Sequence, residues 1–464
     1  MQAFIFDSIL MSAWFPGHSF DTQTNACDVA YNISMEFQSF YQFNSTNMPI
    51  NKTCNWKISI PQNYFVYIYL VAELPKISTI IVKARNQLQQ HRNRRAFYLT
   101  HPGLEIIVET VANVSLNFDI TRQNLSHVFS PTYIDIYKSS HAVVLNSEDT
   151  YHPIMVRGEN QIAIASIAGH FKDLHQYMRA TLIFDGPNWN ATCIGNAYSI
   201  FKSGKMLMPT KRTVTIYTLI PIQTQLRLVI VDKTDLPALT QFHGEYIVAS
   251  GFRNISLSDS SMLLTVTHSI HDEYLSSMSI DENSRLDVYV GGLTNLIASY
   301  NASNIHSDLP QNFRAVVRFY YLNAGSAMLS LTRDKHMARW EHPFAGRRGF
   351  FNAHFHDKND ELIEYYDVIG DSSMQFQFSY KILHFDDGLL YVFIPNHHLG
   401  VYNASDSTNH QWAVFNGPSM SMFYHHANRG ALKFQLDFKI DAINGAKIFS
   451  VFICWHLILF YLIM

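Results

Sequence analysis

The sequence predicts an all-β protein made of tandem β-sandwich units, and the alternation of apolar and polar residues is the main reason. In ALKFQLDFKI (431–440), every second residue from Leu432 to Ile440 is apolar, and the residues between them are polar or charged. QFQFSYKIL repeats this pattern, and CNWKISIP places on one side Trp56, Ile58 and Ile60. A period of two residues is typical of a strand with one buried face.

Turn-rich stretches separate these segments, which is a second reason to expect sandwiches. Examples are SLSDSS, YNASNIHSDLPQN and NASDSTN, which are rich in Asn, Ser and Asp. These residue types favour turns because their side chains bond to the nearby backbone. Long helical patterning is missing, and only ARNQLQQHRNRR (84–95) is expected to form a short helix.

Two distant segments share one order of features, which predicts a repeated sandwich unit. TLIFDGPNWNATCIGNA (181–197) and LDVYVGGLTNLIASYNASNI (286–305) each hold a strand, a glycine near its end, a polar turn and a second apolar segment. A further strand follows each of them, RTVTIYTLI or FRAVVRFYYL. We expect more divergent β units at both ends of the chain.

The composition excludes some classes of function. The 464-residue chain is 47% hydrophobic and 14% aromatic, which is enough for several packed cores, while only 15% of its residues are charged. Its net charge of -3 gives no concentrated basic face, so we expect no nucleic-acid partner. Four cysteines are too few for a scaffold held together mainly by disulfides.

Acceptor triplets for N-linked glycosylation are frequent. They begin at Asn32, Asn44, Asn51, Asn113, Asn124, Asn190, Asn254, Asn301 and Asn403. Such triplets are used only in a secreted chain. Their number therefore predicts an extracellular glycoprotein.

The two ends of the chain predict targeting signals of unequal quality. Residues 1–20 are largely apolar but lack a basic start, and Asp7 interrupts them, so they form a weak signal peptide. Residues 448–464 are almost entirely apolar, at the short limit for a membrane span. Asn444 opens an Asn-Gly-Ala run suited to GPI transfer. We expect 444–464 to be a GPI signal, with a retained tail anchor or a buried strand as alternatives.

The order of segments resembles the nematode CUB-like domain family. CNWKISIPQNY, from Cys54 to Tyr64, is similar to the opening of that domain, and AFYLTHPGLEIIVETVANVSLNFDI (96–120) is similar to its end. ATLIFDGPNWNATCIGNAYSI, LDVYVGG…SDLPQNF and GRRGFF then follow in the order of the multi-unit proteins of this family. The resemblance spans about residues 27–441.

This resemblance implies tandem CUB-like or jelly-roll β-sandwich units and a disulfide between Cys27 and Cys54. The expected segments are a targeting segment at 1–20, a CUB-like domain at 27–121, β units at 122–240, 241–334 and 335–442, and the tail at 444–464. The family is extracellular, often expressed in the intestine and linked to innate immune responses. No catalytic activity is established for it.

The chain departs from CUB domains that have two disulfides and bind calcium. It cannot supply the second bridge, and the acidic calcium ligands cannot be placed in its loops. Asp185 matches the Asp-Gly pair at a strand end, where aspartate is mainly a turn former. Cys193 is left unpaired in the ectodomain, and we expect it to pack as a small apolar side chain, with intermolecular pairing or a nucleophile as alternatives.

Histidine pairs raise the question of a metal site. His354 and His356 lie beside Asp357, and adjacent histidines occur at His397–His398 and His425–His426. Zinc requires three or four converging ligands, and the sequence brings together fewer. We therefore expect no metal and no cofactor.

Two clusters of basic residues stand out in a chain with few charges. HRNRR (91–95) matches the Arg-x-Arg-Arg pattern of processing proteases and could attract anionic glycans or bacterial surfaces. The alternative is a solvated helix end or hairpin tip. Arg347 and Arg348, within GRRG, are expected in a turn.

No sequence pattern of a known enzyme class is present, such as Gly-x-Ser-x-Gly, His-Glu-x-x-His or a Walker loop. We therefore expect no catalytic residues. The expected function is non-enzymatic recognition of proteins, glycans or microbes in innate defence, by a glycoprotein held at the cell surface by its C-terminal anchor. A secreted hydrolase with an unrecognised site and a structural cell-surface coat protein remain alternatives.

Overall fold

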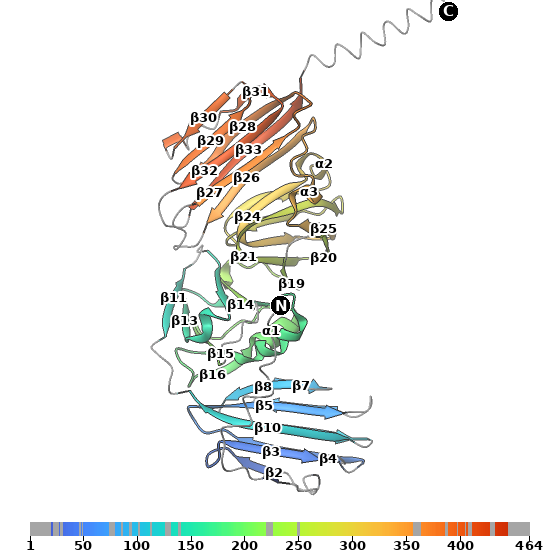
Figure 1. Ribbon diagram of the computed structural model, residues 1–464, viewed down its shortest axis with the longest axis vertical. Coiled ribbons are helices and arrows are strands. Elements are labelled where there is room, and N and C mark those ends of the chain that lie inside the picture. The colour runs from blue at the N-terminus through green and yellow to red at the C-terminus, as the bar shows by residue number, and fades with distance from the viewer. Residues whose placement is uncertain are drawn as a thin grey trace, which may run out of the picture. The chain divides into compact units, whose positions relative to one another are not determined.

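A computed structural model describes residues 20–21, 27, 31–45, 48, 50–73, 79–84, 87–91, 95–100, 103–111, 114–125, 131–137, 141–219, 226–247, 251–355, 363–385, 388–396, 398–403, 405–406, 411–426 and 432–443. Strands dominate its regular structure, which confirms the predicted all-β class (Figure 1). The chain divides into two compact units, one with residues up to 137 and 145–229, the other with 138–144 and the residues from 230 onward.

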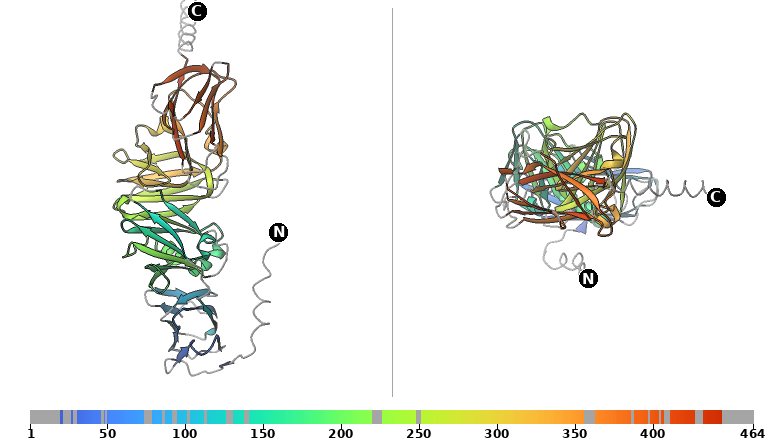
Figure 2. Two further views of the ribbon diagram at one scale, coloured as in Figure 1. Left: turned by 90° about the vertical axis from the view of Figure 1, so that its left-hand side faces the viewer. Right: turned by 90° about the horizontal axis from the view of Figure 1, so that it is seen from above.

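The first ten strands form two five-stranded sheets with the orders β1-β3-β10-β5-β8 and β2-β4-β9-β6-β7. Their bounds are β1 (Phe20–Asp21), β2 (Tyr31–Ser34), β3 (Phe40–Ser45), β4 (Lys52–Ser59), β5 (Tyr64–Glu73), β6 (Thr79–Ala84), β7 (Gln87–His91), β8 (Arg95–Thr100), β9 (Gly103–Thr110) and β10 (Ser115–Asn124). Both sheets contribute side chains to one apolar core, so they pack as a sandwich. Its blue strands are visible in Figure 2.

Alternation along β4 produces the predicted inward set, since Trp56, Ile58 and Ile60 are all at most 2% exposed. The Trp56 ring centroid lies 4.9 Å from that of Phe43 and 5.4 Å from that of Phe118. Phe43 and Phe118 belong to β3 and β10 of the opposite sheet. Trp56 therefore stands in the middle of the sandwich.

The expected short helix at residues 84–95 is wrong. Gln87–His91 forms β7, which pairs antiparallel with β6 at the edge of its sheet. Strand pairing outweighs the helix propensity of Ala and Gln, because the free edge of β6 offers backbone partners that an isolated helix lacks.

The next region contains the sheets β11-β13-β17-β15-β16 and β12-β18-β14. Its elements are β11 (Thr132–Ile136), β12 (Val143–Asn146), η1 (Asp149–Tyr151), β13 (Ile154–Gly158), β14 (Ile162–Ile167), η2 (Lys172–Ala180), β15 (Thr181–Asp185), β16 (Thr192–Asn196), α1 (Ala197–Ser203), β17 (Thr213–Thr218), β18 (Arg227–Asp232) and η3 (Lys233–Asp235). Phe65 and Tyr98 of the first sandwich share an apolar cluster with Leu182 and Phe184 of β15. The first sandwich and this region are thus joined by packed side chains.

A seven-stranded sheet follows, in the order β20-β25-β21-β24-β22-β23, with β19 also paired to β21. The elements are β19 (Gln241–Tyr246), β20 (Arg253–Ser258), β21 (Ser261–Ile280), β22 (Leu286–Val290), β23 (Leu296–Tyr300), α2 (Ile305–Asp308), β24 (Gln311–Leu322), β25 (Ser326–Thr332) and α3 (Lys335–Ala338). β21 pairs with both β24 and β25, and its register shifts within each pairing. With β19, the long strand β21 therefore pairs with three other strands along its length.

The two segments predicted to be repeats have the same local topology. β16-β15-β17 and β23-β22-β24 are consecutive strands in their sheets, and each hairpin is followed by a short helix and the third strand. A register shift interrupts each hairpin, at Ile183/Phe184 in one and at Val288/Tyr289 in the other. The sequence echo therefore corresponds to a shared hairpin, helix and strand motif.

The C-terminal sandwich consists of the four-stranded sheets β26-β33-β28-β31 and β27-β32-β29-β30, drawn in orange to red in Figures 1 and 2. Its strands are β26 (Arg347–Phe355), β27 (Ile363–Gly370), β28 (Phe376–Phe385), β29 (Leu389–Ile394), β30 (His398–Tyr402), β31 (Ala413–Gly417), β32 (Ser419–His426) and β33 (Leu432–Ala442). The predicted alternation is confirmed, because Phe434, Leu436, Phe438 and Ile440 are at most 2% exposed.

Candidate functional site

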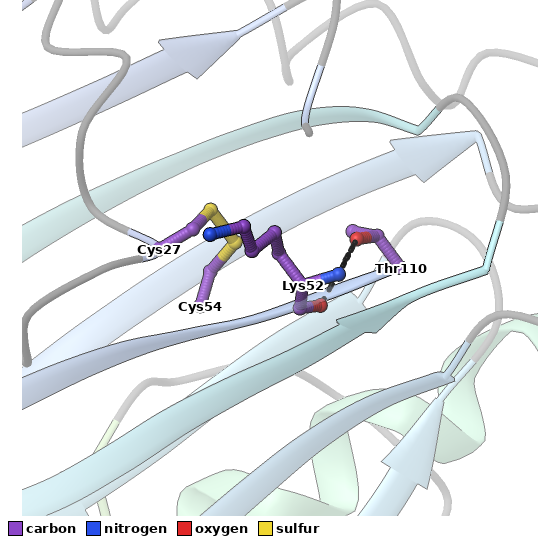
Figure 3. The surroundings of a disulfide bond; sticks show 4 residues. All are labelled: Cys27, Lys52, Cys54 and Thr110. Atoms are coloured by element: carbon purple, nitrogen blue, oxygen red, sulfur yellow. Dashed lines mark hydrogen bonds between the residues drawn. A yellow bond between two sulfur atoms is a disulfide. The ribbon is translucent and has the colours of Figure 1, made fainter. Parts of the chain in front are cut away.

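Cys27 and Cys54 form the disulfide that the family resemblance implied (Figure 3). Cys54 lies on β4 with its side chain in the core, next to the inward set that begins at Trp56. Close by, Thr110 Oγ1 donates to the Lys52 carbonyl at 3.0 Å and accepts from the Lys52 amide at 3.2 Å. These bonds fix the start of β4 against β9, so the bridge ties residue 27 to an ordered strand.

Most of the predicted glycan acceptors lie where a glycan can be attached. The exposed ones are Asn32, Asn44, Asn51, Asn124, Asn190, Asn254 and Asn403. Asn301 is half-buried, and Asn113 lies outside the described residues. The exposed set is distributed over both compact units, so glycosylation of the chain stays a prediction that these positions allow.

Cys193 lies on β16, and its environment suits packing better than chemistry. The residue is half-buried, and its thiol donates to the Gly195 carbonyl at 3.5 Å. Burial of the sulfur raises the pKa of the Cys193 thiol to about 11. A thiol with this pKa is protonated at neutral pH and is a poor nucleophile.

Asp185 closes a loop at the end of β15, in line with its predicted role as a turn former. Its carboxylate accepts from the Thr210 hydroxyl at 2.5 Å and from the Thr210 and Lys211 amides at 3.1 and 2.9 Å. Burial alone would raise the pKa of Asp185, but these hydrogen bonds lower it below its usual value. The carboxylate oxygens are thus engaged by the chain's own donors.

The predicted histidine and basic clusters fall largely outside the described residues. His356, Asp357, His397 and residues 92–94 are among those outside. Within the part of the chain that the structure describes, no group of three or more His, Cys, Asp or Glu could hold a metal ion.

The ends of the chain carry predictions that lie beyond the described residues. The targeting segment, apart from Phe20, and the anchor region including Asn444 are both outside them. No helix among the described residues has the length and apolar character needed to cross a membrane.

The expected turn at GRRG is wrong, because Arg347 begins β26 and is completely buried. Its guanidinium donates to the carbonyls of Trp340, His342 and Pro310 at 2.8, 2.6 and 3.3 Å. It also stands 4.9 Å from the Trp340 ring centroid. Arg348, the next residue, is exposed. No motif marks one of two adjacent arginines as buried, so sequence reasoning missed this contact.

Trp340 reaches this position through the end of α3. Asp334 caps the helix by accepting from the His336 and Met337 amides, and Arg339 ends it with a φ of 57°. The Trp340 amide then bonds to the Lys335 carbonyl at 2.9 Å. This closing turn, typical of a helix C-terminus, points the chain toward the core of the C-terminal sandwich.

Asp367 is the buried acceptor for Trp340. It lies on the inward side of β27, accepts from Trp340 Nε1 at 2.9 Å and from the Tyr365 hydroxyl at 2.6 Å, and is 7% exposed. The pKa of Asp367 is raised to about 6, mainly by burial. The nearby charge of Asp272 also raises this pKa, whereas the hydrogen bonds from Tyr365 and Trp340 lower it. Asp367 is therefore a buried carboxylate that titrates close to neutral pH.

Asn312 extends this polar network into the seven-stranded sheet. Its Nδ2 lies 3.1 Å from Asp272 Oδ1 and 3.4 Å from Asp367 Oδ2, so one amide contacts two carboxylates. Arg314 donates to Asp272 at 3.1 Å and stacks 4.1 Å from the Tyr365 ring centroid. We call these residues, with Trp340 and Arg347, the polar junction. The polar junction connects the seven-stranded sheet to the C-terminal sandwich. Its two carboxylates, Asp272 and Asp367, both accept hydrogen bonds.

The outward side of the sheet β27-β32-β29-β30 carries a broad apolar surface. We define the outer face by its apolar members, Tyr366, Leu389, Tyr391, Phe393, Leu399, Val401 and Phe423. Tyr366 and Leu399 are 63% and 62% exposed, and Val401 and Phe393 are 52% and 45% exposed. Among the side chains described on this side of the sheet, none is Asp, Glu, Lys or Arg.

Strand register lines up the outer face across the whole sheet. Tyr366 pairs with Phe423, Phe423 with Tyr391, and Tyr391 with Val401. Phe393 pairs with Leu399 in the adjacent row. The Tyr391 and Phe423 ring centroids are 5.7 Å apart. The row through Phe423 is therefore apolar across all four strands, and on β32 this row is flanked by Ser421 and His425.

One signal in the sequence could have revealed the outer face. β29 reads LLYVFI, with apolar residues at every position rather than at alternate ones. Leu390, Val392 and Ile394 fill the core, so the other three must be covered by a partner or exposed. A strand that is apolar on both sides is typical of a sheet buried on both faces.

Comparison with known proteins identifies parts of the chain. Residues 21–126 match the family described as CUB-like domain. Residues 135–219 match Domain of unknown function (DUF7592), and residues 238–334 match Domain of unknown function (DUF7591). No curated protein matches the chain.

Solved structures show only a distant likeness. The CUB1-EGF-CUB2 domain of human MASP-1/3 is 10% identical, with 42% of this chain and 99% of that one covered and a TM-score of 0.18. The full extracellular region of zebrafish Gpr126/Adgrg6 is 11% identical, with coverages of 88% and 52% and a TM-score of 0.19. The family matches and the disulfide together identify this chain as an extracellular-type protein with a CUB-like domain at residues 21–126, followed by two domains of families of unknown function.

Proposed function

We propose that this protein is a non-enzymatic extracellular glycoprotein of the nematode CUB-like type that contributes to innate immune defence by recognising microbes. The outer face is the observation that carries this proposal. Contiguous exposed apolar patches larger than a few hundred Å² are rare on monomeric proteins and mark sites of interaction. The cores of protein interfaces are likewise depleted in charge and enriched in aromatic side chains.

The chemistry of the outer face favours an apolar patch on a microbial surface protein as its ligand. Phe393, Leu399 and Val401 offer aliphatic and aromatic area, and Tyr366 adds a hydroxyl that lies 3.3 Å from Ser421 Oγ. The described side chains offer no Lys or Arg to pair with an anionic glycan or a lipid phosphate. Burial of such area would provide most of the binding free energy.

Binding to intact bacteria tests this proposal. Purified full-length protein is incubated with one Gram-negative and one Gram-positive species, and the cell-bound fraction is measured after sedimentation. We expect binding that falls by about tenfold or more in the double variant F393S/L399S, since two exposed apolar anchors are lost. Shaving the bacterial surface with protease before incubation should abolish binding by the unaltered protein.

Met374→Ser is the matched control, because Met374 is 55% exposed in the same sandwich but lies outside the outer face. It should bind as the unaltered protein does. Binding that survives protease shaving would identify a glycan or lipid ligand instead, and equal binding by F393S/L399S would refute the role of the face.

We also propose that residues 444–464 are a GPI signal: the bond after Asn444 is cleaved, residues 445–464 leave, and the lipid anchor joined to Asn444 holds the protein at the cell surface. The apolar run and its small preceding residues support this proposal. Phosphatidylinositol-specific phospholipase should release the protein from intact cells. Retention after this treatment would support a tail anchor.

A further inference from the structure

We propose that an N-linked glycan on Asn403 lies over the β30 side of the outer face and limits which partners reach it. This inference concerns the regulation of the recognition surface and rests on the proposed function. It starts from the position of one acceptor among the nine triplets of the sequence. Asn403 directly follows β30, the strand at the edge of the sheet that carries the outer face.

The alternation of β30 places the acceptor on the same side as the apolar residues. Leu399 and Val401 are exposed, whereas Gly400 is buried and Tyr402 bonds to the core residue Tyr380 at 2.6 Å. Asn403 continues the exposed series and is itself exposed. Two residues of extended chain span roughly 7 Å, so the first sugar starts beside Val401.

The loop after β30 holds Asn403 in a fixed arrangement. Asn403 Oδ1 accepts from the Ser405 amide at 2.9 Å and from the Ser405 hydroxyl at 2.5 Å. The Asn403 amide donates to Asp406 Oδ2 at 2.8 Å, and the Asp406 amide donates back to the Asn403 carbonyl at 2.9 Å. A glycan leaving this loop therefore has a defined starting point rather than a free tether.

A carbohydrate suits this surface chemically. The C–H groups of a sugar ring are apolar and slightly positive, and aromatic faces are slightly negative. The hydroxyl groups at the ring edge stay in water, so the sugar needs no charged partner on the sheet. Phe393 lies opposite Leu399 on the adjacent strand, roughly 5 Å away in the sheet, within reach of the inner sugars.

Hydroxyl-radical footprinting of the full chain from a glycosylating eukaryotic host tests the inference. Labelling of Phe393 and Leu399 is compared between the unaltered protein, Asn403→Gln and Ser405→Ala, both of which destroy the acceptor. We expect a several-fold rise in labelling of both residues in the two variants. Bacterial binding should rise in parallel, because the recognition face is freed.

Two controls separate the glycan from effects on folding. Ser405→Thr keeps the acceptor and should label as the unaltered protein does. Asn254→Gln removes an exposed acceptor on β20 of another sheet and should leave Phe393 and Leu399 unchanged. Mass mapping of Asn403 establishes its occupancy in each sample.

Two results would overturn the inference while leaving the proposed recognition function standing. One is an unoccupied Asn403, and the other is an occupied Asn403 with equal labelling in all variants. Protection that grows with protein concentration would show instead that a second copy covers the face. Conversely, failure of the bacterial-binding test alone would refute the recognition function and leave the footprinting result intact.

Discussion

The first sandwich and the C-terminal sandwich are both built around a buried tryptophan, but they hold it differently. Trp56 is surrounded by Phe43 and Phe118, and no described group accepts a hydrogen bond from its Nε1. Trp340 donates to Asp367 and lies against the guanidinium of Arg347. The two sandwiches show that one architecture can be centred on apolar packing or on a charged network.

The difference has consequences for stability. The first sandwich adds the Cys27–Cys54 disulfide to an apolar core, so its stability depends on redox state. The C-terminal sandwich contains a buried carboxylate and a buried guanidinium whose removal leaves unsatisfied partners. Each sandwich should therefore respond to a different perturbation, and the following experiments are ordered by expected effect. Hydrogen exchange of peptides from β4 and β9, and from β28 and β33, follows the two sandwiches separately.

Arg347→Met should give the largest effect. It removes the donors to the Trp340, His342 and Pro310 carbonyls. A buried acceptor left without its donor costs about 1–3 kcal/mol, so we expect a total loss of about 3–5 kcal/mol. The C-terminal peptides should then exchange much faster, with no change in β4 and β9. Arg348→Met, at the exposed neighbouring position, should cost less than about 0.5 kcal/mol. Equal effects of the two variants would contradict the buried role of Arg347.

Removing the disulfide should perturb the other sandwich. Replacing Cys27 and Cys54 by Ala opens a loop with a sequence separation of 27 residues. In the chain-entropy account the loss is roughly 3–4 kcal/mol, and chemical reduction should reproduce it. Peptides from β4 and β9 should lose protection, whereas those from β28 and β33 should not. A response in the C-terminal sandwich would refute the comparison.

A pH series tests the buried carboxylate. Burial raises the pKa of Asp367 from 3.8 to about 6, so the folded state holds the proton more tightly than the unfolded state. This stabilisation is present below about pH 4 and is lost as pH rises through 6, which amounts to about 3 kcal/mol. Asp367→Asn should abolish that part of the pH dependence, measured as the stability difference from the unaltered protein.

Asp371→Asn is the control for the pH series. Its pKa is lowered by hydrogen bonds from Ser373, so its contribution runs in the opposite direction and is lost as pH falls. The carboxyl group is exposed, and we expect no measurable change between pH 5 and 7. Parallel pH profiles for Asp367→Asn and the unaltered protein would refute the assignment.

The smallest expected effect is the difference in stability loss between two variants in which each tryptophan is exchanged for phenylalanine. Both variants lose ring volume, but Trp340→Phe also removes a donor to the buried Asp367 carboxylate. It should therefore cost about 1–2 kcal/mol more than Trp56→Phe. Trp340→Phe should also move the Asp367 titration to higher pH, because a bond that lowers the pKa is lost. Equal costs would indicate that the indole hydrogen bond contributes little.

Alternation allowed much of the fold to be predicted from the sequence. The inward residues of β4, β28 and β33 could be predicted because successive side chains of a strand point to opposite faces. A strand with one buried face therefore has an apolar residue at every second position. The shared hairpin motif of β15 and β22 was also detectable, since strand, turn and strand are adjacent in the chain. The short β7 was missed because its structure depends on pairing with β6 rather than on its own residues.

The candidate site could be predicted far less well. The outer face requires knowledge of which strands are neighbours, since its rows join residues from β27, β29, β30 and β32. The LLYVFI pattern of β29 indicated a sheet that is apolar on both sides. It did not indicate which residues of the other strands belong to the outer face. Asn403 was predicted as an acceptor, and only the sheet order places it beside this face.

By itself the sequence determined the all-β class, the inward residues of its clearest strands and the positions of the acceptor triplets, because these depend on local periodicity and short motifs. The tertiary structure decided which of Arg347 and Arg348 is buried, although both are arginines and they are adjacent in GRRG. One is buried against three carbonyls and the other is exposed. The physical reason is that burial depends on which distant strands and loops surround a side chain, and adjacent residues of a strand face opposite sides.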